Sequence, residues 1–375
     1  MRNPLLGGLA TRTFLSRHWQ KQALLVRQAI PHFGGVLDFR ELMGLACSDT
    51  VESRLVVRDA RRWTLRHGPF DRADFRRLPA RNWTLLVQGV NLHDDRAAAL
   101  LARFAFLPHA RLDDLMVSYA VPGGGVGPHF DAYDVFLLQG EGKRRWRIGR
   151  QNDLALVPGA PLKILRRFQP EGEAILLGGD MLYLPPRFAH HGVAVTECTT
   201  WSIGYRAPTH QELASRFLSD LAERLVLPGQ YADPDLAATV HPGRIGGALV
   251  ATTERLLAGI RWRRRDVTDF LGRHLTEPKP QVFFDPPPTR HGSTGIVARI
   301  RRQGAKLDRR SLMLYADHAV YLNGEEYRFP RGVPAPLREL ADRRCLAPQA
   351  VPAPIATVLY DWWAAGFIRL PAAGS

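Results

Sequence analysis

The sequence predicts an α+β fold whose middle section is an all-β sandwich or barrel, with helical segments on either side of it. Three observations support this. From residue 114 to about residue 207, short apolar or alternating runs recur between Gly and Pro, among them LMVSYAV, DVFLLQG and DMLYLPP, which is the pattern of such a β fold. After Pro208, apolar residues return at helical spacing. Proline then gathers in residues 277–288 (EPKPQVFFDPPP) and marks a boundary.

The segment that precedes the β-rich region indicates an α+β lead-in. Strand-like pieces at residues 53–58 and 83–88 alternate with short helical patterns, and residues 92–106 carry Ala, Leu and Arg at helical spacing before Pro108. We therefore assign residues 1–208 to one β-rich domain together with this lead-in.

The remainder of the chain indicates a helical connector, over residues 209–276, and a small C-terminal domain, over residues 277–375. Thr209 is a candidate N-cap with Glu212 three residues later, and helical runs follow at about 247–257 and 266–275. These helices either pack on the β-rich domain or form a dimerisation region, since periodicity does not distinguish the two. The tail has strand-like pieces, an Asn323-Gly324 hairpin turn and a helical run at 337–342, which indicate a winged-helix-like domain.

The composition indicates which binding partners and which cellular compartment to expect. The 375 residues include 51 Lys and Arg against 36 Asp and Glu, a formal charge of +15, which favours contact with polyanions or ribonucleoprotein surfaces. The alternative is a solvated basic surface, because Arg outnumbers Lys as in many GC-rich genomes. The three cysteines are far apart and suggest neither a zinc site nor a disulfide framework. With no apolar run long enough for a membrane span, we expect a cytoplasmic protein without membrane contact.

A candidate metal site lies in the β-rich region. His129 and Asp131 are two residues apart in GPHFDAYD, and on an extended strand such residues point to the same face. His190 and His191 follow about sixty residues later, after a Pro-Pro turn, in the order that a double-stranded β-helix needs. Two His and one carboxylate leave three positions open on iron(II), enough for a bidentate co-substrate and O2. Neighbours on a strand face opposite ways, so one of the two adjacent histidines is expected to point inward.

A cluster of cations lies between these histidines, in KRRWR at residues 143–147. Trp146 is expected inside the barrel, and strand alternation then turns Arg144 inward as well. A buried Arg needs an anionic partner, which is either the far carboxylate of 2-oxoglutarate, suited to a planar fork of donors, or a protein carboxylate. Ser118 and Ser202 are candidates to help bind that co-substrate, and the alternative for both is an ordinary strand serine.

Around these residues the sequence resembles the JmjC-type cupin oxygenases, and most closely the bacterial ribosomal oxygenases that hydroxylate an arginine of a large-subunit ribosomal protein. The resemblance rests on VPGGGVGPHFDAYDVFLLQGEGKRRWRIG and GDMLYLPPRFAHHGVAVTECTTWSIGYRAP. It extends over the chain as architecture, because that family also has a cupin, a helical dimerisation region and a C-terminal winged-helix domain.

The resemblance implies an Fe(II)- and 2-oxoglutarate-dependent dioxygenase that uses O2, acts on a large-subunit ribosomal protein and forms a homodimer. By it, His129, Asp131 and His190 match the iron ligands, Arg144 matches the 2-oxoglutarate anchor, and Ser118 matches a position lining the co-substrate or substrate. His191 stands where some relatives have an acidic residue.

Other functions are compatible with the same residues. One is a JmjC-type oxygenase or demethylase that acts on another protein or on a small molecule. Another is a metal-binding cupin regulator without turnover, whose tail reads nucleic acid. For an arginine substrate we expect acidic or aromatic groups at the mouth of the site, and Asp134, Tyr133 and Tyr119 are the nearest in sequence.

Overall fold

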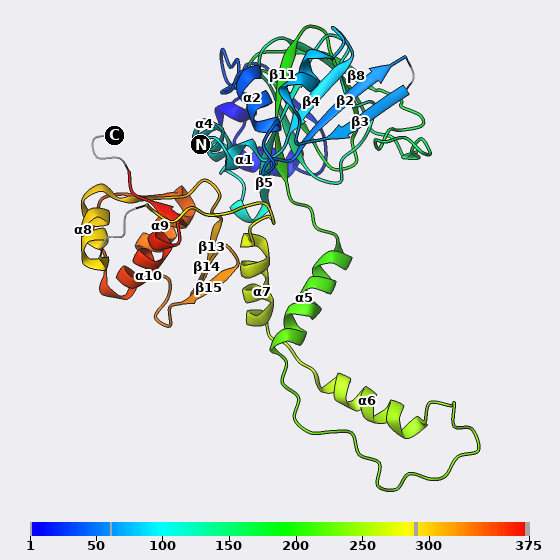
Figure 1. The fold of residues 1–375 in the computed structure, drawn as a ribbon, viewed down its shortest axis with the longest axis vertical. Helices are drawn as coiled ribbons and strands as arrows, with labels where there is room; N and C mark the ends of the chain where they lie inside the picture. The colour runs from blue at the N-terminus through cyan, green and yellow to red at the C-terminus, as the bar shows by residue number, and fades with distance from the viewer. Residues whose placement is uncertain (1, 61, 289–291, 372–375) are drawn as a thin grey trace. The chain divides into compact units, whose positions relative to one another are not determined.

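The computed structural model describes residues 2–60, 62–288 and 292–371, which divide into two compact units (Figure 1). Unit 1 is made of Met1–Ala207, Pro278–Leu312 and Glu339–Ser375, and unit 2 of Pro208–Glu277 and Met313–Arg338. Within the described residues, no helix combines the length and the apolar character that crossing a membrane requires.

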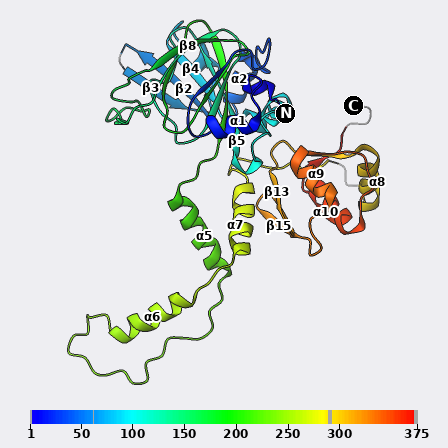
Figure 2. The same ribbon diagram turned by 180° about the vertical axis from the view of Figure 1, so that it is seen from behind.

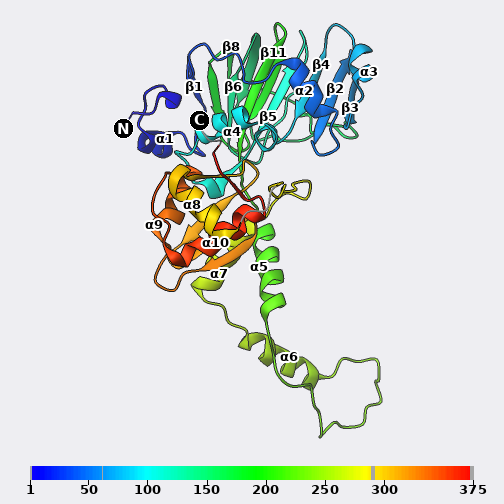
Figure 3. The same ribbon diagram turned by 60° about the vertical axis from the view of Figure 1, so that its left-hand side comes forward.

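The largest element of unit 1 is an antiparallel sheet of eight strands, in the order β1-β9-β6-β11-β5-β4-β2-β3 (Figure 3). In chain order its strands are β1 (Leu24–Val26), β2 (Ser53–Asp59), β3 (Arg62–His67), β4 (Trp83–Val87), β5 (Leu112–Ala120), β6 (Val135–Gln139), β9 (Met181–Leu184) and β11 (Cys198–Tyr205).

A second, three-stranded sheet has the order β10-β7-β8. Its strands are β7 (Lys143–Gly149), β8 (Gly172–Leu177) and β10 (Ala189–Ala194). Side chains from both sheets share one buried cluster: Val135, Leu137, Leu182 and Leu184 come from the large sheet, and Trp146 and Leu176 from the small one. The two sheets therefore enclose a common interior, and the predicted β sandwich or barrel is confirmed as a jelly roll.

The other face of the large sheet packs against helices. The main core joins the sheet to α1 (Thr11–Arg17), α2 (Phe39–Ala46) and α4 (Asp95–Ala102) through Phe14, Leu42 and Leu100 among others. The shorter elements of this region are η1 (Pro4–Leu6), α3 (Arg72–Arg76), η2 (Val90–Leu92) and η3 (His109–Arg111). The helix expected at 92–106 is shorter than predicted, because Asp94 caps its start by accepting from the backbone N–H groups of Arg96 and Ala97.

The C-terminal parts of unit 1 form a small α/β arrangement. A sheet in the order β16-β12-β17 accompanies two helices that contact each other, α8 and α10. The bounds are α8 (Ser293–Gln303), β12 (Ala305–Leu307), β16 (Cys345–Leu346), α10 (Ala353–Ala364) and β17 (Ile368–Arg369), and α9 (Ala335–Arg343) crosses the division between the units.

Unit 2 contains the helices of the expected connector and a three-stranded sheet. The helices are α5 (His210–Arg224), α6 (Gly247–Gly259) and α7 (Arg264–Thr276), and the strands are β13 (Met313–Ala316), β14 (Ala319–Leu322) and β15 (Glu325–Arg328). Thr209 caps α5 by accepting from the backbone N–H of Glu212, and Asn323-Gly324 forms the β14–β15 turn; both predictions are confirmed. Helices α5 and α7 lie side by side (Figure 2), with Phe217 and Phe270 ring centroids 5.5 Å apart.

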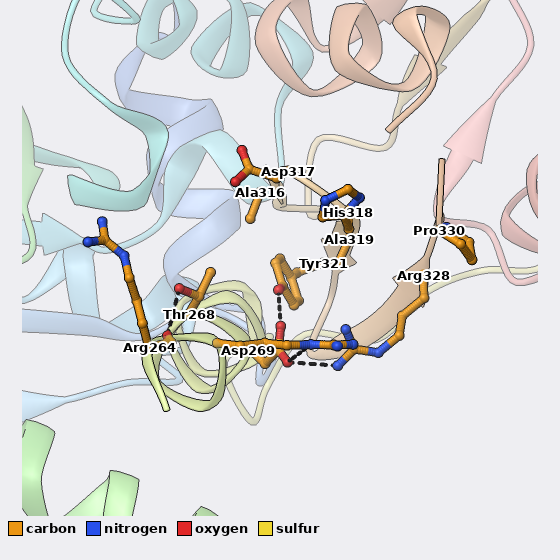
Figure 4. A pocket seen from close by; sticks show the side chains of 11 residues that line it. Arg264, Thr268, Asp269, Ala316, Asp317, His318, Ala319, Tyr321, Arg328 and Pro330 are labelled. Atoms are coloured by element: carbon orange, nitrogen blue, oxygen red, sulfur yellow. Dashed lines mark hydrogen bonds and ion pairs between the residues drawn. The ribbon is translucent and has the colours of Figure 1, made fainter. Parts of the chain in front are cut away.

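A hollow of about 570 Å³ lies between the start of α7 and the β13–β14 turn (Figure 4). At its base the buried carboxylate of Asp269 accepts from the Tyr321 hydroxyl at 2.5 Å and from Arg328 at 2.7 Å. Because Asp269, Tyr321 and Arg328 pair with one another, we assign these contacts to the attachment of α7 to the sheet.

Candidate active site

Three candidate ligands converge at one end of the jelly-roll interior. Ligand atoms of His129, Asp131 and His190 all lie within 4.8 Å of one another. The Nε2 atom of His190 is 3.6 Å from Oδ2 of Asp131, and the two imidazole centroids are 4.2 Å apart. This spacing lets one ion contact all three side chains.

The backbone that carries His129 differs from the predicted strand. His129 and His190 form an isolated antiparallel bridge with N···O distances of 2.9 and 2.8 Å, but no longer ladder runs through residues 127–131. Gly127 has a φ of 82° and Pro128 lacks an N–H, so a regular strand stops there. The bridge sets the two histidines beside each other.

Both histidines are oriented by backbone carbonyls. Nδ1 of His129 donates to the Gly127 carbonyl at 3.0 Å, and Nδ1 of His190 donates to the Phe188 carbonyl at 2.9 Å. With Nδ1 protonated, Nε2 keeps its lone pair, as a metal ligand must. Burial, together with the neighbouring His129, lowers the pKa of His190 to about 4, so this imidazole is neutral at physiological pH.

His191 lies outside this cluster. Its Nδ1 is 3.0 Å from Nη2 of Arg147, and its ring is 6.3 Å from that of Phe168. Burial and the neighbouring Arg147 and Arg58 lower its pKa to about 4. Neutral His191 therefore accepts a hydrogen bond from Arg147, on the side of β10 opposite to His190.

Arg144 points into the interior, as strand alternation predicts. It is 4% exposed, and its Nη1 donates to the Ser118 hydroxyl at 3.0 Å. Its Nε and Nη2 are buried and have no hydrogen-bond partner among the described residues. No carboxylate of the described residues forms an ion pair with Arg144. A buried guanidinium with two free N–H directions needs an anion that the described protein does not supply.

The two candidate serines differ in their contacts. Ser118 on β5 pairs with Thr200 on β11, and Ser202 lies two residues further along β11, on the same inward side. Of the two hydroxyls, the one that contacts Arg144 in the described structure is that of Ser118. The Trp146 ring completes this wall, with its centroid 5.8 Å from the Arg144 guanidinium carbon and 5.8 Å from the His190 ring.

Tyr133 lies at the mouth of the site, next to an acid that the sequence did not reveal. Its side chain is 42% exposed, and burial together with Asp131 and Asp114 raises its pKa. A Cβ built on Gly204 would lie 3.9 Å from Oδ1 of Asp114 and 4.0 Å from Cε2 of Tyr133, so the acid and the ring both border Gly204.

Asp114 is a buried carboxylate that already holds a cation. Its Oδ2 accepts from Nζ of Lys279 at 3.2 Å and from Nε2 of Gln88 at 2.8 Å, and Lys279 also reaches Asp113 at 3.3 Å. The signal in the sequence was weak, because two consecutive Asp residues in a strand-like run usually lie on the surface.

The other two residues expected at the mouth are elsewhere, so that prediction was wrong for them. Tyr119 belongs to the main core, where its ring stacks on Phe39 at 4.2 Å. Asp134 is fully buried and accepts from the Tyr183 hydroxyl at 2.6 Å and from Gln20 at 3.0 Å. Tyr119 turns toward the helices that cover the large sheet, because neighbours on a strand face opposite ways, and Asp134, directly before β6, turns toward Gln20 and Tyr183.

The residues at this site fit iron(II) and a dicarboxylate together. Two imidazoles and a carboxylate form the donor set of non-haem iron oxygenases, and the unpartnered N–H groups of Arg144 match a second carboxylate in a bidentate pair. The interior therefore provides for a metal and for an anion held at a distance from it.

Comparison with known proteins agrees with this arrangement. Residues 99–213 match the family model of the JmjC domain, and residues 259–369 match that of the ROXA-like winged helix. The ribosomal protein uL16 3-hydroxylase of Escherichia coli is 35% identical over 322 residues, which cover 84% of this chain and 85% of that protein.

Solved structures extend the likeness to the whole chain. The X-ray structure of E. coli YcfD has a TM-score of 0.84 at 31% identity and covers 97% of this chain and 98% of that one. The ribosomal oxygenase YcfD in complex with cobalt and 2-oxoglutarate has a TM-score of 0.81 at 31% identity, over 97% and 99%. The JmjC cupin fold and the C-terminal winged helix, predicted from the sequence, are thereby confirmed, and the chain belongs to the JmjC-domain ribosomal oxygenase family.

Proposed function

We propose that this protein is an Fe(II)- and 2-oxoglutarate-dependent dioxygenase that hydroxylates an arginine of a large-subunit ribosomal protein, uL16. The observation that carries the proposal is the buried, half-unpartnered guanidinium of Arg144 beside the cluster of His129, Asp131 and His190. A metal-binding protein without turnover has no need of an inward cation at that position.

Each residue of the site has a defined part in the proposal. His129, Asp131 and His190 would hold iron(II), with the tautomers set by the two backbone carbonyls. When bound, iron with 2-oxoglutarate and O2 supplies the oxidation, in which the co-substrate leaves as succinate and CO2 and one oxygen atom enters a substrate C–H bond. Arg144 would pair with the far carboxylate, with Ser118 holding the guanidinium in place. Ser202 is the further candidate for contact with the co-substrate.

The mouth of the site suits an arginine side chain. The Asp114 carboxylate already binds the Lys279 ammonium at 3.2 Å, so it accepts a cation. The exposed face of Tyr133 beside it can stack on a planar guanidinium. We therefore infer that the substrate arginine extends past Tyr133 and places its guanidinium by Asp114, which borders Gly204 together with that ring.

The test is a reaction of the purified protein with Fe(II), 2-oxoglutarate, O2 and recombinant uL16. Succinate is measured together with the mass of the tryptic peptides of uL16, and one added oxygen on an arginine is expected. At a subsaturating concentration of 2-oxoglutarate, Arg144→Ala should strongly lower both signals, whereas Arg145→Ala, an exposed neighbour with the same loss of charge, should keep them. Succinate release without any modified ribosomal peptide would refute uL16 as the substrate and leave the proposal of an oxygenase in place.

We also propose that the protein is a cytoplasmic homodimer, because a ribosomal substrate is made and assembled there. Helices α5 and α6 leave the apolar side chains of Leu218, Leu249, Val250, Leu256 and Leu257 between 43% and 56% exposed, which favours a partner for them. Light scattering after size exclusion should give twice the 42.0 kDa chain mass, and a monomer would contradict this. The division into a catalytic domain at 1–208, a connector at 209–276 and a domain at 277–375 stays a prediction.

A further inference from the structure

Positive charge is concentrated around one loop of unit 1. Residues 142–167 contain eight Lys or Arg and a single acid, Asp153, so about half of the formal net charge of the chain comes from this short segment. One of the eight, Arg144, points inward to the site described above. The other cations need a separate explanation.

The loop that follows β7 folds back on itself next to the candidate iron site. Leu156 and Leu165 form a bridge, and the backbone N–H of Leu165 donates to the Pro128 carbonyl at 2.7 Å, one residue from His129. A Cβ built on Gly127 would lie 3.2 Å from Ile164. Buried Ile164 and Leu165 thus fasten the loop beside the entrance.

The cations of this loop are exposed and unengaged. Lys163, Arg166 and Arg167 flank the buried pair and are exposed to solvent. Among the described residues, no carboxylate lies within ion-pair distance of these three side chains. Three unpaired cations in one turn repel one another, and an anionic partner would relieve that repulsion.

Two more cations continue the surface onto the neighbouring strands. Arg147 on β7 is half-buried and contacts His191, and Arg58 on β2 is half-buried and lies over the ring of Trp63 on β3. Figure 1 shows the loops after β7 beside β2 and β3. In agreement with this, a Cβ built on Gly127 would lie 3.3 Å from the ring of Trp63 on β3.

Aromatic rings lie among these cations. The Arg58 guanidinium carbon is 5.7 Å from the centroid of the Trp63 ring, and the Phe168 ring is 6.3 Å from that of His191. Both rings are half-buried and keep part of their surface in solvent. Cations that follow a backbone, interleaved with rings on which bases stack, are the features of a single-stranded nucleic-acid surface.

We propose that this cationic rim, formed by Arg58, Arg147, Lys163, Arg166 and Arg167, binds the phosphodiester backbone of RNA. The unpaired cations match phosphates, and the interleaved rings favour a nucleic acid over an acidic peptide. The choice of RNA over DNA rests on the proposed function, since a ribosomal substrate brings RNA to the entrance of the site.

The test measures binding of a short fluorescein-labelled single-stranded RNA to the full chain by anisotropy over a series of salt concentrations. The triple variant Lys163→Ala/Arg166→Ala/Arg167→Ala removes three phosphate contacts, so the slope of log K against log[salt] should fall by about 2. At about 0.1 M salt the association constant should fall on the order of 100-fold.

A matched triple variant, Arg12→Ala/Arg40→Ala/Arg103→Ala, removes the same charge from exposed positions on α1, α2 and the end of α4. It should keep most of the affinity and the salt slope. Equal losses in both triple variants, or displacement of the RNA by polyglutamate at matched charge, would overturn the proposal. Turnover of 2-oxoglutarate by the rim variant should stay at the wild-type level, so failure of RNA binding is separable from failure of the oxygenase.

Discussion

Arg144→Ala should weaken the binding of 2-oxoglutarate far more than the binding of the metal. The guanidinium is 4% exposed, and two of its N–H directions have no partner among the described residues, so the co-substrate carboxylate would be its main counter-charge. Loss of one partner of a buried, hydrogen-bonded charge pair costs about 2–5 kcal/mol. We therefore expect the dissociation constant of 2-oxoglutarate to rise at least about 30-fold.

Ser118→Ala separates the orientation of the guanidinium from its charge. The hydroxyl accepts from Nη1 of Arg144 at 3.0 Å, and a hydrogen bond to a charged group is worth about 1.5–3 kcal/mol. Because the guanidinium keeps its charge and loses one contact that orients it, we expect the dissociation constant of 2-oxoglutarate to rise about tenfold, at the low end of that range. Ser202→Ala tests the further candidate serine separately, since that residue lies on the same inward side of the sheet and makes no hydrogen bond to Arg144 in the described structure.

The assay is calorimetric titration of 2-oxoglutarate into protein loaded with Mn(II), with the Mn(II) affinity measured separately by electron paramagnetic resonance. Arg145→Ala controls for the loss of one cation from the exposed side of β7. If Arg144→Ala bound 2-oxoglutarate as tightly as the wild type, or if Arg145→Ala weakened it as much as Arg144→Ala, the role of Arg144 as anchor would be refuted.

Three further substitutions test other parts of the structure. Gly192→Ala would place a Cβ 2.7 Å from the Trp146 ring, so we expect a loss of about 1–3 kcal/mol in chemical denaturation; Gly172→Ala, whose nearest neighbour would be 3.9 Å away, should be nearly neutral, and equal effects would contradict the packing argument. His129→Ala should abolish stoichiometric Mn(II) binding, and retention of full metal content would exclude the site. Burial raises the pKa of Asp134 above 3.8, and the hydrogen bond from the Tyr183 hydroxyl opposes that rise. Tyr183→Phe removes this hydrogen bond, so the pKa of Asp134 in the folded protein should rise further. Folded Asp134 therefore keeps its proton at pH values above 3.8, and the folded protein loses stability as the pH rises through this window. The loss of unfolding free energy in the variant should grow from about pH 4 to about pH 7, and a loss independent of pH would count against this reasoning.

The part of the site that the sequence predicts is the part set by the alternation of side chains between the two faces of one strand. Trp146 had to be buried, and a strand then turns Arg144 inward with it, which needed no knowledge of the fold. The pairing of His129 with His190 was reached for a partly wrong reason. Gly127 and Pro128 interrupt the expected strand, and an isolated bridge between residues far apart in sequence sets the geometry.

Long-range contacts account for what the sequence did not reveal. Asp114 becomes a candidate cation site only because Lys279, 165 positions later, reaches it, and no local pattern encodes that meeting. Asp134 and Tyr119 are close in sequence to residues of the site, yet strand alternation turns Tyr119 into the main core, and Asp134, directly before β6, is buried against Tyr183 of that core. Proximity in sequence was a poor guide to the mouth, because two residues side by side on a strand belong to different surfaces.

The cation cluster of β7 combines two functions in one strand, and this has an experimental consequence. Arg144 points inward to the co-substrate site, whereas Arg147 on the other side contacts His191 and belongs to the cationic rim. These two arginines share no partner in the described structure, so their contributions to free energy should add. In the double variant Arg144→Ala/Arg147→Ala, the affinity for 2-oxoglutarate should match that of Arg144→Ala and the affinity for RNA that of Arg147→Ala. A double variant that lost more of either affinity than the single ones would show that the two sides of the strand are coupled.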